Sequence, residues 1–274
     1  GSMRWTDDTQ MALDLAESLL IQGKLVQNDL AIRFARSYRW SRGYGAGASR
    51  VLSLISKGVD WQQAAKSVFR DGSFGNGAAM RAPVLALFCR DNLKELVKIT
   101  RDASEVTHSH EVGVDGAVLI AVATNQLLLD QDNAGVLSAV KNSCRTEEML
   151  TVLQLASDWL TGNYKASPSE VAERLGNGIA AHQSCVTALY IALRFIGSTF
   201  DEMFDFIVAC KGDVDTIGAM AGAMWGARNG HEKLPAVKIE QKRLLELTAL
   251  RLEEATNRPD ECLRQCQAML DHTM

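Results

Sequence analysis

Helical periodicity of the apolar residues runs through nearly all of this 274-residue chain and constrains its fold more than any other feature. In the first such stretch, Met11, Leu15 and Leu19 recur at the spacing that lines one face of a helix. No segment of any length shows the alternation of apolar and polar residues that is typical of a half-buried strand. Only four prolines interrupt the chain. The sequence therefore predicts an all-α fold built from many helices.

The breaks in this periodicity fall at glycine clusters and not at Pro/Ser-rich linkers, so the sequence indicates no domain boundary. We expect a single compact domain over residues 4–274. The preceding Gly1-Ser2-Met3 is typical of a tag-cleavage remnant followed by a start methionine. Beyond three helices within the first 60 residues, we expect helices over 61–69, 77–89, 92–103, 110–129, 133–142, 146–161, 167–175, 180–198, 200–210, 215–228 and 239–257, and after Pro259.

Charge and composition exclude several classes of protein. The 29 basic and 33 acidic residues give a net charge of −4, so there is no basic excess that would favour sequence-specific nucleic-acid binding. The longest apolar runs, 116–123 and 127–129, are far shorter than the ~18–20 residues of a membrane span. The six cysteines are scattered without a C-x-x-C pair, which is typical of reduced thiols. We expect a cytoplasmic monomer, or a nuclear one if the source is eukaryotic.

Two short segments carry a pair of aspartates and at least one threonine at the start of an expected helix. The first is Thr6-Asp7-Asp8-Thr9, and the second is Asp213-Val214-Asp215-Thr216. One interpretation is helix capping, because Asp and Thr are favoured N-caps and acids complement the helix dipole. Capping needs one side chain, however, and each segment offers at least three oxygen donors.

The other interpretation is a site for hard divalent cations. Mg²⁺ and Mn²⁺ prefer carboxylate, hydroxyl and water oxygens. Four aspartates brought together would repel one another, and two cations roughly 3.5–4 Å apart would neutralise them. Zinc templates need a Cys/His spacing that is missing here, and a di-iron bundle would need a second unit like Glu105-x-x-His108.

Glycine-rich loops precede other expected helices and are candidates for holding an anion. Gly72-Ser-Phe-Gly-Asn-Gly77 leads into an apolar helix whose free amides can bind a group such as a pyrophosphate. Its spacing matches neither a P-loop nor a dinucleotide fingerprint, so an ordinary loop is the alternative. Arg42-Gly-Tyr-Gly-Ala-Gly47 is similar, whereas Leu175-Gly-Asn-Gly-Ile179 also fits a corner between helices. His108 and His110 fit either a helix cap or a donor to a ligand.

In their order along the chain, these segments resemble the ADP-ribosylglycohydrolase family of the dinitrogenase-reductase-activating type. The tracts GYGAG, GSFGNGAAMR and LGNGIAA are most similar to its ADP-ribosylserine hydrolase branch. The resemblance covers residues 4–257 and implies a single orthogonal multi-helix domain with a central dinuclear metal site. The implied ions are two Mg²⁺, with Mn²⁺ as the alternative, and the implied partners are ADP-ribose and ADP-ribosylated proteins.

The resemblance also implies roles for individual residues. Asp7 or Asp8 would take a proton from the attacking water and is the implied catalytic group. The implied metal ligands are Thr6, Asp7, Asp8, Asp213, Asp215 and Thr216. The residues implied to bind the diphosphate, the distal ribose and the adenosine part of the substrate are Gly43, Tyr44, Gly45, Gly47, Ser73, Phe74, Gly75, Asn76, His108 and Ile179.

The implied reaction is hydrolysis of the bond between ribose C1″ and a protein side chain, assisted by metals that polarise the ribose diol. Serine linkage is favoured, and arginine linkage, poly(ADP-ribose) and O-acetyl-ADP-ribose are the other implied substrates. Family members usually carry one or two helices before the Thr-Asp-Asp motif, with a glutamate that contributes to catalysis in the serine branch. Here the motif begins at Thr6. The alternative expectation is therefore an ADP-ribose-binding module with little or no turnover.

Overall fold

Helices make up the regular structure of the chain, as the periodicity predicts. The computed structural model describes residues 4–236 and 239–257, and within these residues it has an isolated bridge between Gly75 and Ala180 but no strand. The expected tag remnant and the helix after Pro259 lie outside the described residues. The elements are α1 (Asp7–Gln22), α2 (Gln27–Ser37), η1 (Trp40–Arg42), α3 (Ala46–Ser56), α4 (Trp61–Val68), η2 (Asn76–Arg81), α5 (Pro83–Phe88), α6 (Leu93–Glu105), α7 (Glu111–Leu128), α8 (Asn133–Ser143), α9 (Glu147–Thr161), α10 (Pro168–Arg174), α11 (Ala181–Arg194), α12 (Phe200–Cys210), α13 (Val214–Asn229), η3 (His231–Lys233) and α14 (Lys242–Asn257).

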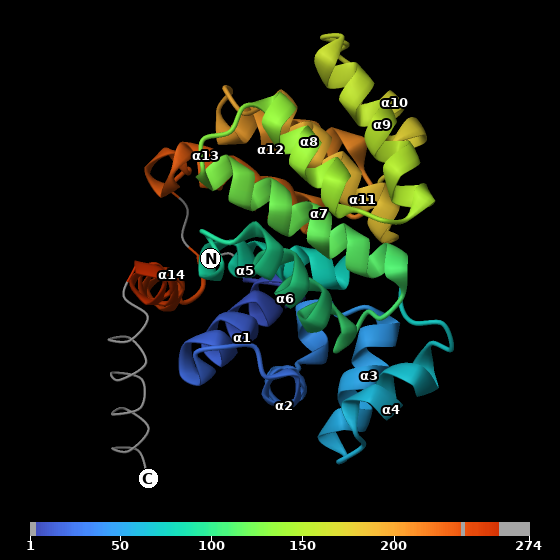
Figure 1. Ribbon diagram of the computed structural model, residues 1–274, viewed down its shortest axis with the longest axis vertical. Helices are drawn as coiled ribbons and strands as arrows, with labels where there is room; N and C mark the ends of the chain where they lie inside the picture. The colour runs from blue at the N-terminus through green and yellow to red at the C-terminus, as the bar shows by residue number, and fades with distance from the viewer. Residues whose placement is uncertain (1–3, 237–238, 258–274) are drawn as a thin grey trace.

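Helix α7 is the centre of the fold. In Figure 1 it crosses the molecule between α8–α13 on one side and α1–α6 on the other, and it packs against α5, α6, α8, α11, α13 and η2. Its sequence is apolar on all sides, with Ala117, Ile120 and Ala123 fully buried, as expected for a helix surrounded by others. By length and composition alone α7 could cross a membrane, but 83% of it is buried inside the protein. Such burial is typical of a core helix.

The helix expected over 77–89 is divided into two elements. Asn76–Arg81 forms the 3₁₀ turn η2, and α5 begins at Pro83. Because Pro83 has no N–H, it cannot donate to a carbonyl one turn earlier, and it instead occupies the first position of a new helix. The side chain of Arg81 folds back along η2 and donates from Nη1 to Gly77 O at 2.9 Å. The helix expected over 180–198 ends earlier, at Arg194.

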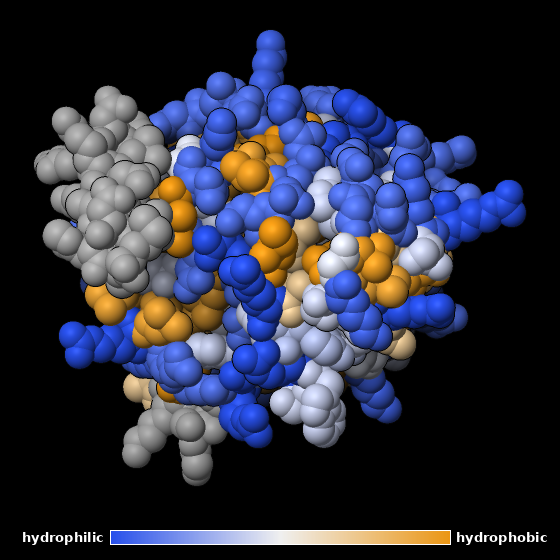
Figure 2. Space-filling model, turned by 90° about the horizontal axis from the view of Figure 1, so that it is seen from below, coloured by the Kyte–Doolittle hydropathy of each residue, from blue (hydrophilic) through white to orange (hydrophobic). Residues whose placement is uncertain are grey.

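Helix α14 packs on the outside of α1 and α5. Ala16, Leu20 and Leu252 form a small apolar cluster in this seam, separate from the main core. Seen from below, the molecule presents mainly polar side chains, and apolar side chains reach the surface in separate groups (Figure 2). The four cysteines in the described residues, at positions 89, 144, 185 and 210, are free thiols, in agreement with the expectation of reduced cysteines.

A buried ion pair joins the helices around α7. Asp115 is fully buried on α7, and its Oδ1 accepts a hydrogen bond from Arg101 Nη2 of α6 at 3.0 Å. Its Oδ2 accepts from the backbone amides of Arg145 and Thr146, immediately before α9, each at 2.6 Å. These three donors, from two parts of the chain, compensate the unfavourable burial of the carboxylate.

We predict that Asp115→Asn lowers the free energy of unfolding by about 3 kcal/mol, because the amide leaves Arg101 without a counterion and sets N–H groups against N–H groups. Urea denaturation measures the loss. Asp102→Asn, which breaks the exposed pair between Lys98 and Asp102, is the matched control and should change stability little. Equal losses in the two variants would contradict the importance of the buried charge.

Candidate functional site

The two acidic segments meet at the N-terminal ends of α1 and α13. Asp7 and Asp8 lie in the first turn of α1, while Asp213 occupies the N-cap position of α13 and Asp215 lies in its first turn. The two helices are in contact, and the charges of Asp213 and Asp215 act on Asp7. We call these four side chains the acidic cluster. The fold thus brings together residues that are about 200 positions apart in the sequence.

Capping does not account for the acidic cluster. Thr6 and Asp213 occupy the two N-cap positions, yet within the described residues neither side chain accepts a hydrogen bond from an amide of its own helix. Thr6 Oγ1 instead donates to Asp8 Oδ2 at 2.5 Å. Ser167 and Thr199 form complete capping boxes at α10 and α12, which shows that the chain caps helices conventionally elsewhere.

The environment of the acidic cluster disfavours its negative charge. Burial, followed by the charges of Asp8, Asp215 and Asp213, raises the pKa of Asp7 to about 7. Burial also raises the pKa values of Asp8 and Asp213 above the ordinary range, and the charge of Asp215 adds to both shifts. Asp8 Oδ1 is buried and has no hydrogen-bond partner among the described residues. Such a cluster takes up protons or a cation.

The donor set of the cluster suits a hard cation. Its carboxylates are joined by the hydroxyls of Thr6 and Thr216, the latter interacting with both Asp8 and Asp213. Within the described residues, no three His, Cys, Asp or Glu side chains form a ready-made metal-ligand set. A cation would therefore have to draw the carboxylates of the acidic cluster closer together.

Asn76 connects the glycine loop 72–77 to the acidic cluster. Its Nδ2 donates to Asp213 Oδ2 at 2.6 Å and to Ser184 Oγ of α11 at 3.0 Å. Its backbone amide donates to Ile179 O at 2.9 Å, and Ala181 N donates to Phe74 O at the same distance. The loop is thus held between the start of α11 and the start of α13.

The segment 175–179 is more than a corner between helices. Asn177 O accepts a hydrogen bond from Asp213 N at 2.8 Å, and Asn177 Nδ2 donates to Cys210 O at the same distance. Gly212 has φ +75°, and a Cβ on it would lie 2.1 Å from Asn177 O. Only glycine allows this close approach, which sets the position of Asp213. The sequence did not single out Asn177, and its only signal was the Asn between two glycines.

Arg42 holds the start of α1. It donates from Nη1 to Trp5 O at 2.8 Å and forms a bidentate ion pair with Glu240 at 2.7 and 2.9 Å. Its guanidinium also lies 4.9 Å from the centre of the Trp5 ring. A Cβ on the next residue, Gly43, would lie 3.7 Å from Asp7 Oδ1, so the backbone of this loop passes beside the acidic cluster.

The other residues predicted in this loop are placed differently. The Tyr44 ring is buried against Tyr38, with ring centres 4.9 Å apart. Gly47 faces the Phe69 ring, where a Cβ would lie 2.1 Å from Cζ, and Gly45 is exposed. Gly43 is beside the acidic cluster, and the Tyr44 hydroxyl is also near it, because burial and then the charges of Asp14 and Asp7 raise the pKa of Tyr44 above its ordinary value.

The two histidines of the sequence hypothesis have different roles. His110 caps α7, because its Nδ1 accepts a hydrogen bond from Val112 N at 3.2 Å, and its ring contacts Phe74 edge-on. His108 is buried, with Nε2 directed at the glycine loop, 3.5 Å from where a Cβ on Gly75 would lie. Phe74 and Ile179 are exposed on the two segments that Asn76 joins.

A buried carboxyl behind the site was not predicted. Asp14 lies two turns after the Asp7–Asp8 pair on α1 and accepts hydrogen bonds from Gln10 Nε2 at 3.2 Å and from the Ser37 hydroxyl. Burial raises its pKa to about 6, although both hydrogen bonds oppose the shift. The sequence offered no signal for it, because an aspartate within a helix is ordinarily exposed.

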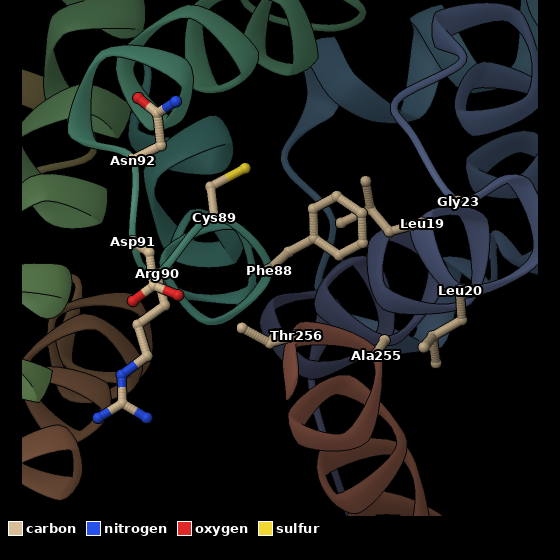
Figure 3. Close-up of a pocket in the computed structure, with 10 residues that line it drawn as sticks. All are labelled: Leu19, Leu20, Gly23, Phe88, Cys89, Arg90, Asp91, Asn92, Ala255 and Thr256. Atoms are coloured by element: carbon tan, nitrogen blue, oxygen red, sulfur yellow. The ribbon is translucent and has the colours of Figure 1, made fainter. Parts of the chain in front are cut away.

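A cavity of about 320 Å³ lies at the opposite end of α1 from the acidic cluster (Figure 3). Leu19, Leu20 and Phe88 form its apolar wall, and the last turn of α14 closes one side. Burial raises the pKa of the Cys89 thiol at its edge to about 11, so the thiolate is scarce at neutral pH. None of the predicted site residues lines this cavity.

Comparisons with known proteins identify the family of the chain. The family model for ADP-ribosylglycohydrolase matches residues 2–262, and the chain belongs to that family of glycohydrolase enzymes. ADP-ribosylhydrolase ARH3 of Mus musculus is 34% identical over 267 residues, covering 85% of this chain and 72% of the mouse protein. ARH3 of Homo sapiens is 33% identical over 267 residues, covering 85% and 73%.

The fold is also shared with a solved structure. An "ADP-ribosylglycohydrolase-related protein complex" superposes with a TM-score of 0.71 at 25% sequence identity, covering 92% of this chain and 82% of that chain. The family resemblance and the all-α fold predicted from the sequence are both confirmed. The roles predicted for individual site residues stay predictions.

We predict that the metal-free protein loses stability as the pH rises from about 5 to about 8. The pKa of Asp7 is raised from 3.8 to about 7, so the folded protein binds the additional proton, and this contribution disappears as the pH rises through 7. Asp14, with a pKa of about 6, acts in the same direction. Asp7→Asn should therefore be more stable than the unaltered protein at about pH 8 by ~1–2 kcal/mol, after allowance for solvent screening.

Urea denaturation in EDTA at several pH values makes this comparison. Asp205→Asn, which alters an exposed aspartate on α12, is the matched control and should keep the pH dependence of the unaltered protein. If Asp7→Asn were no more stable than the unaltered protein at the higher pH, the unfavourable charge of the acidic cluster would be refuted.

Proposed function

We propose that the chain is a Mg²⁺-dependent ADP-ribosyl hydrolase that removes ADP-ribose from modified proteins, with serine linkage favoured. The acidic cluster carries this proposal, because its aspartates lie at two helix starts without capping them and beside a glycine loop joined to it through Asn76. Family membership supports the reaction class, and the curated relatives are named ADP-ribosylhydrolases.

The residues present fit a pair of hard cations. Thr6, Asp7, Asp8, Asp213, Asp215 and Thr216 would hold two Mg²⁺, or Mn²⁺ as the alternative. The buried, unpartnered Oδ1 of Asp8 supports this assignment, as do the raised pKa values of Asp7, Asp8 and Asp213. When bound, Mg²⁺ supplies charge neutralisation and Lewis-acid polarisation of the ribose diol.

The residues of the chain would orient the ligand and move the proton. Asp7 or Asp8 takes a proton from water as the water oxygen bonds to ribose C1″. The bond from C1″ to the serine oxygen breaks, and that oxygen takes up a proton. Thr6 holds one oxygen of Asp8, at 2.5 Å, which restricts the carboxylate to a defined orientation.

The remainder of ADP-ribose would lie along the glycine loops. Ser73, Gly75, Asn76 and His108 would hold the diphosphate and the distal ribose, because the loop between them is fixed from both sides. Gly43 offers backbone contacts beside Asp7. Phe74 and Ile179 are exposed, and Ile179 would contact the adenosine part.

The preference for serine linkage is supported by the tracts GYGAG, GSFGNGAAMR and LGNGIAA, which are most similar to the serine-specific branch of the family. The tracts lie in three loops near the acidic cluster. GYGAG passes beside Asp7, and GSFGNGAAMR holds Asp213 through Asn76. LGNGIAA contacts the GSFGNGAAMR loop through the hydrogen bond from Asn76 N to Ile179 O. The same loops therefore carry the ligand and the branch-specific sequence.

We predict that the protein releases ADP-ribose from a serine-ADP-ribosylated peptide in Mg²⁺ but not in EDTA. Asp7→Asn and Asp215→Asn should each lower kcat/KM by roughly 10²-fold or more, because both remove charge that the cations need. Asp205→Asn is the matched control and should retain full activity. Chromatography of released ADP-ribose, with an arginine-linked peptide in parallel, measures turnover and linkage.

The other outcomes separate the alternatives. Release from the arginine-linked peptide alone would contradict the preference for serine linkage but support the proposed hydrolase activity. If no peptide is cleaved but ADP-ribose raises the melting temperature in Mg²⁺, the protein is an ADP-ribose-binding module. If neither occurs, the proposed function is wrong.

A further inference from the structure

Arg81 is a charged side chain in the interior of the protein. The residue is 2% exposed, and its guanidinium carbon lies 4.7 Å from the centre of the Phe34 ring. It donates hydrogen bonds to Gly77 O at 2.9 Å, to Ala103 O at 3.2 Å and to Thr107 Oγ1 at 2.8 Å. Burial lowers its pKa to about 9, which is still above neutral, so the side chain stays charged.

The hydrogen bond from Arg81 to Thr107 bears on the direction of the hydrogen bond between Thr107 and His108. A guanidinium has donors and no acceptor, so Thr107 Oγ1 must accept from Arg81. The same hydroxyl lies 2.8 Å from His108 Nδ1, and no other acceptor for its hydrogen occurs among the described residues. The hydroxyl could accept from both Arg81 and Nδ1–H, but its own hydrogen would then have no acceptor among the described residues. Donation from the Thr107 hydroxyl to Nδ1 satisfies that hydrogen, and this arrangement leaves Nδ1 unprotonated and places the ring proton on Nε2.

The protonated nitrogen faces the glycine loop. A Cβ on Gly77 would lie 2.9 Å from His108 Nε2 and 2.7 Å from Cε1, so the absence of a side chain at Gly77 gives the ring its place. Burial, and then the charge of Arg81, lowers the pKa of His108 to about 3. The ring is neutral at physiological pH and presents a single N–H donor.

We propose that Arg81 and Thr107 are positioning residues that fix His108 as its Nε2–H tautomer, which makes it a neutral hydrogen-bond donor to an oxygen of the ligand in the glycine loop. The identity of that ligand, the diphosphate or distal ribose of ADP-ribose, rests on the proposed function. The tautomer does not, because it follows from the contacts of the protein alone.

A neutral donor suits this place in the molecule. The acidic cluster is joined to the same loop by the hydrogen bond from Asn76 to Asp213. A histidine that gained and lost a charge would alter the field at the cluster with pH, whereas a fixed neutral tautomer donates a directed hydrogen bond without a change of charge. The hydrogen bonds from Arg81 to Thr107 and from Thr107 to His108 therefore let the ring bind a ligand oxygen without a change in its own charge as the pH changes.

The tautomer can be read directly by NMR. In protein labelled with ¹⁵N only at its five histidines, long-range ¹H–¹⁵N spectra distinguish the two ring nitrogens, and loss of a signal in His108→Gln assigns the residue. We expect the Nε2–H pattern in the unaltered protein and in Thr107→Ser, which keeps the hydroxyl. In Thr107→Val, which has similar volume but no hydroxyl, we expect a second tautomer to appear.

Binding gives the second readout. With Mg²⁺ present, the Kd for ADP-ribose by calorimetry should rise about tenfold or more in Thr107→Val, as expected for loss of one donor, and by no more than about twofold in Thr107→Ser. An Nδ1–H or doubly protonated ring in the unaltered protein would overturn the proposal. So would an unchanged His108 pattern or an unchanged Kd in Thr107→Val.

Failure of this proposal can be told from failure of the proposed function. If the unaltered protein does not bind ADP-ribose, the proposed function and the ligand assignment fail, while the NMR pattern still decides whether Arg81 and Thr107 fix the tautomer. If Thr107→Val melts far below Thr107→Ser, the NMR pattern of the unaltered protein and the serine variant decides the tautomer alone.

Discussion

Asn76 donates to Asp213 and Ser184 through one side-chain amide, and its backbone amide donates to Ile179. These contacts fix the glycine loop against α11, the turn before it, and the start of α13. Because Asp213 is the N-cap residue of α13, the same amide also holds the start of the second acidic segment against the glycine loop. Because like charges repel, the four carboxylates do not come together unless other contacts hold the two segments in place. The contacts of Asn76 are among those that hold Asp213 near Asp7 and Asp8.

The site combines features that stabilise the protein poorly. Four carboxylates share a partly buried space, and one of their oxygens is buried without a partner in the described part of the chain. The N-terminal ends of α1 and α13 offset part of this repulsion through their dipoles, and the aligned amides cost nothing to position because the helices are already formed. The remaining unfavourable charge is typical of a site whose residues are selected for a bound ion and not for the stability of the free protein.

The sequence predicts much of the fold, because helices packed around an apolar centre impose a regular spacing on every element. It also indicates the acidic pairs and glycine loops, since carboxylates, hydroxyls and glycines at helix starts are unusual in these numbers. It cannot predict that the two acidic segments meet, because this depends on how α1 and α13 pack against each other and against η2. The division at Pro83 was readable in principle, because proline lacks the amide that a continuous helix requires.

Residues that act through others were beyond prediction. Arg81 follows an apolar stretch, where an arginine is expected to be at the surface near a helix end. The packing of η2 against α6 and α7 buries it instead. Asn177 and Asp14 are similar, because their importance lies in a partner far along the chain and not in their own neighbourhood. Sequence patterns therefore identified the aspartates, threonines and glycine loops of the candidate site more readily than the residues that hold these groups in position.

The ion pair between Arg42 and Glu240 joins residues 198 positions apart. Arg42 also holds the backbone of Trp5, immediately before the first acidic segment. During synthesis from the N-terminus, Asp7 and Asp8 emerge about 200 residues before Asp213, Asp215 and Glu240. Until those residues are made, the nascent chain carries the first acidic segment without the second one and without the carboxylate that pairs with Arg42. The acidic cluster can therefore assemble only after the start of α13 and Glu240 have left the ribosome.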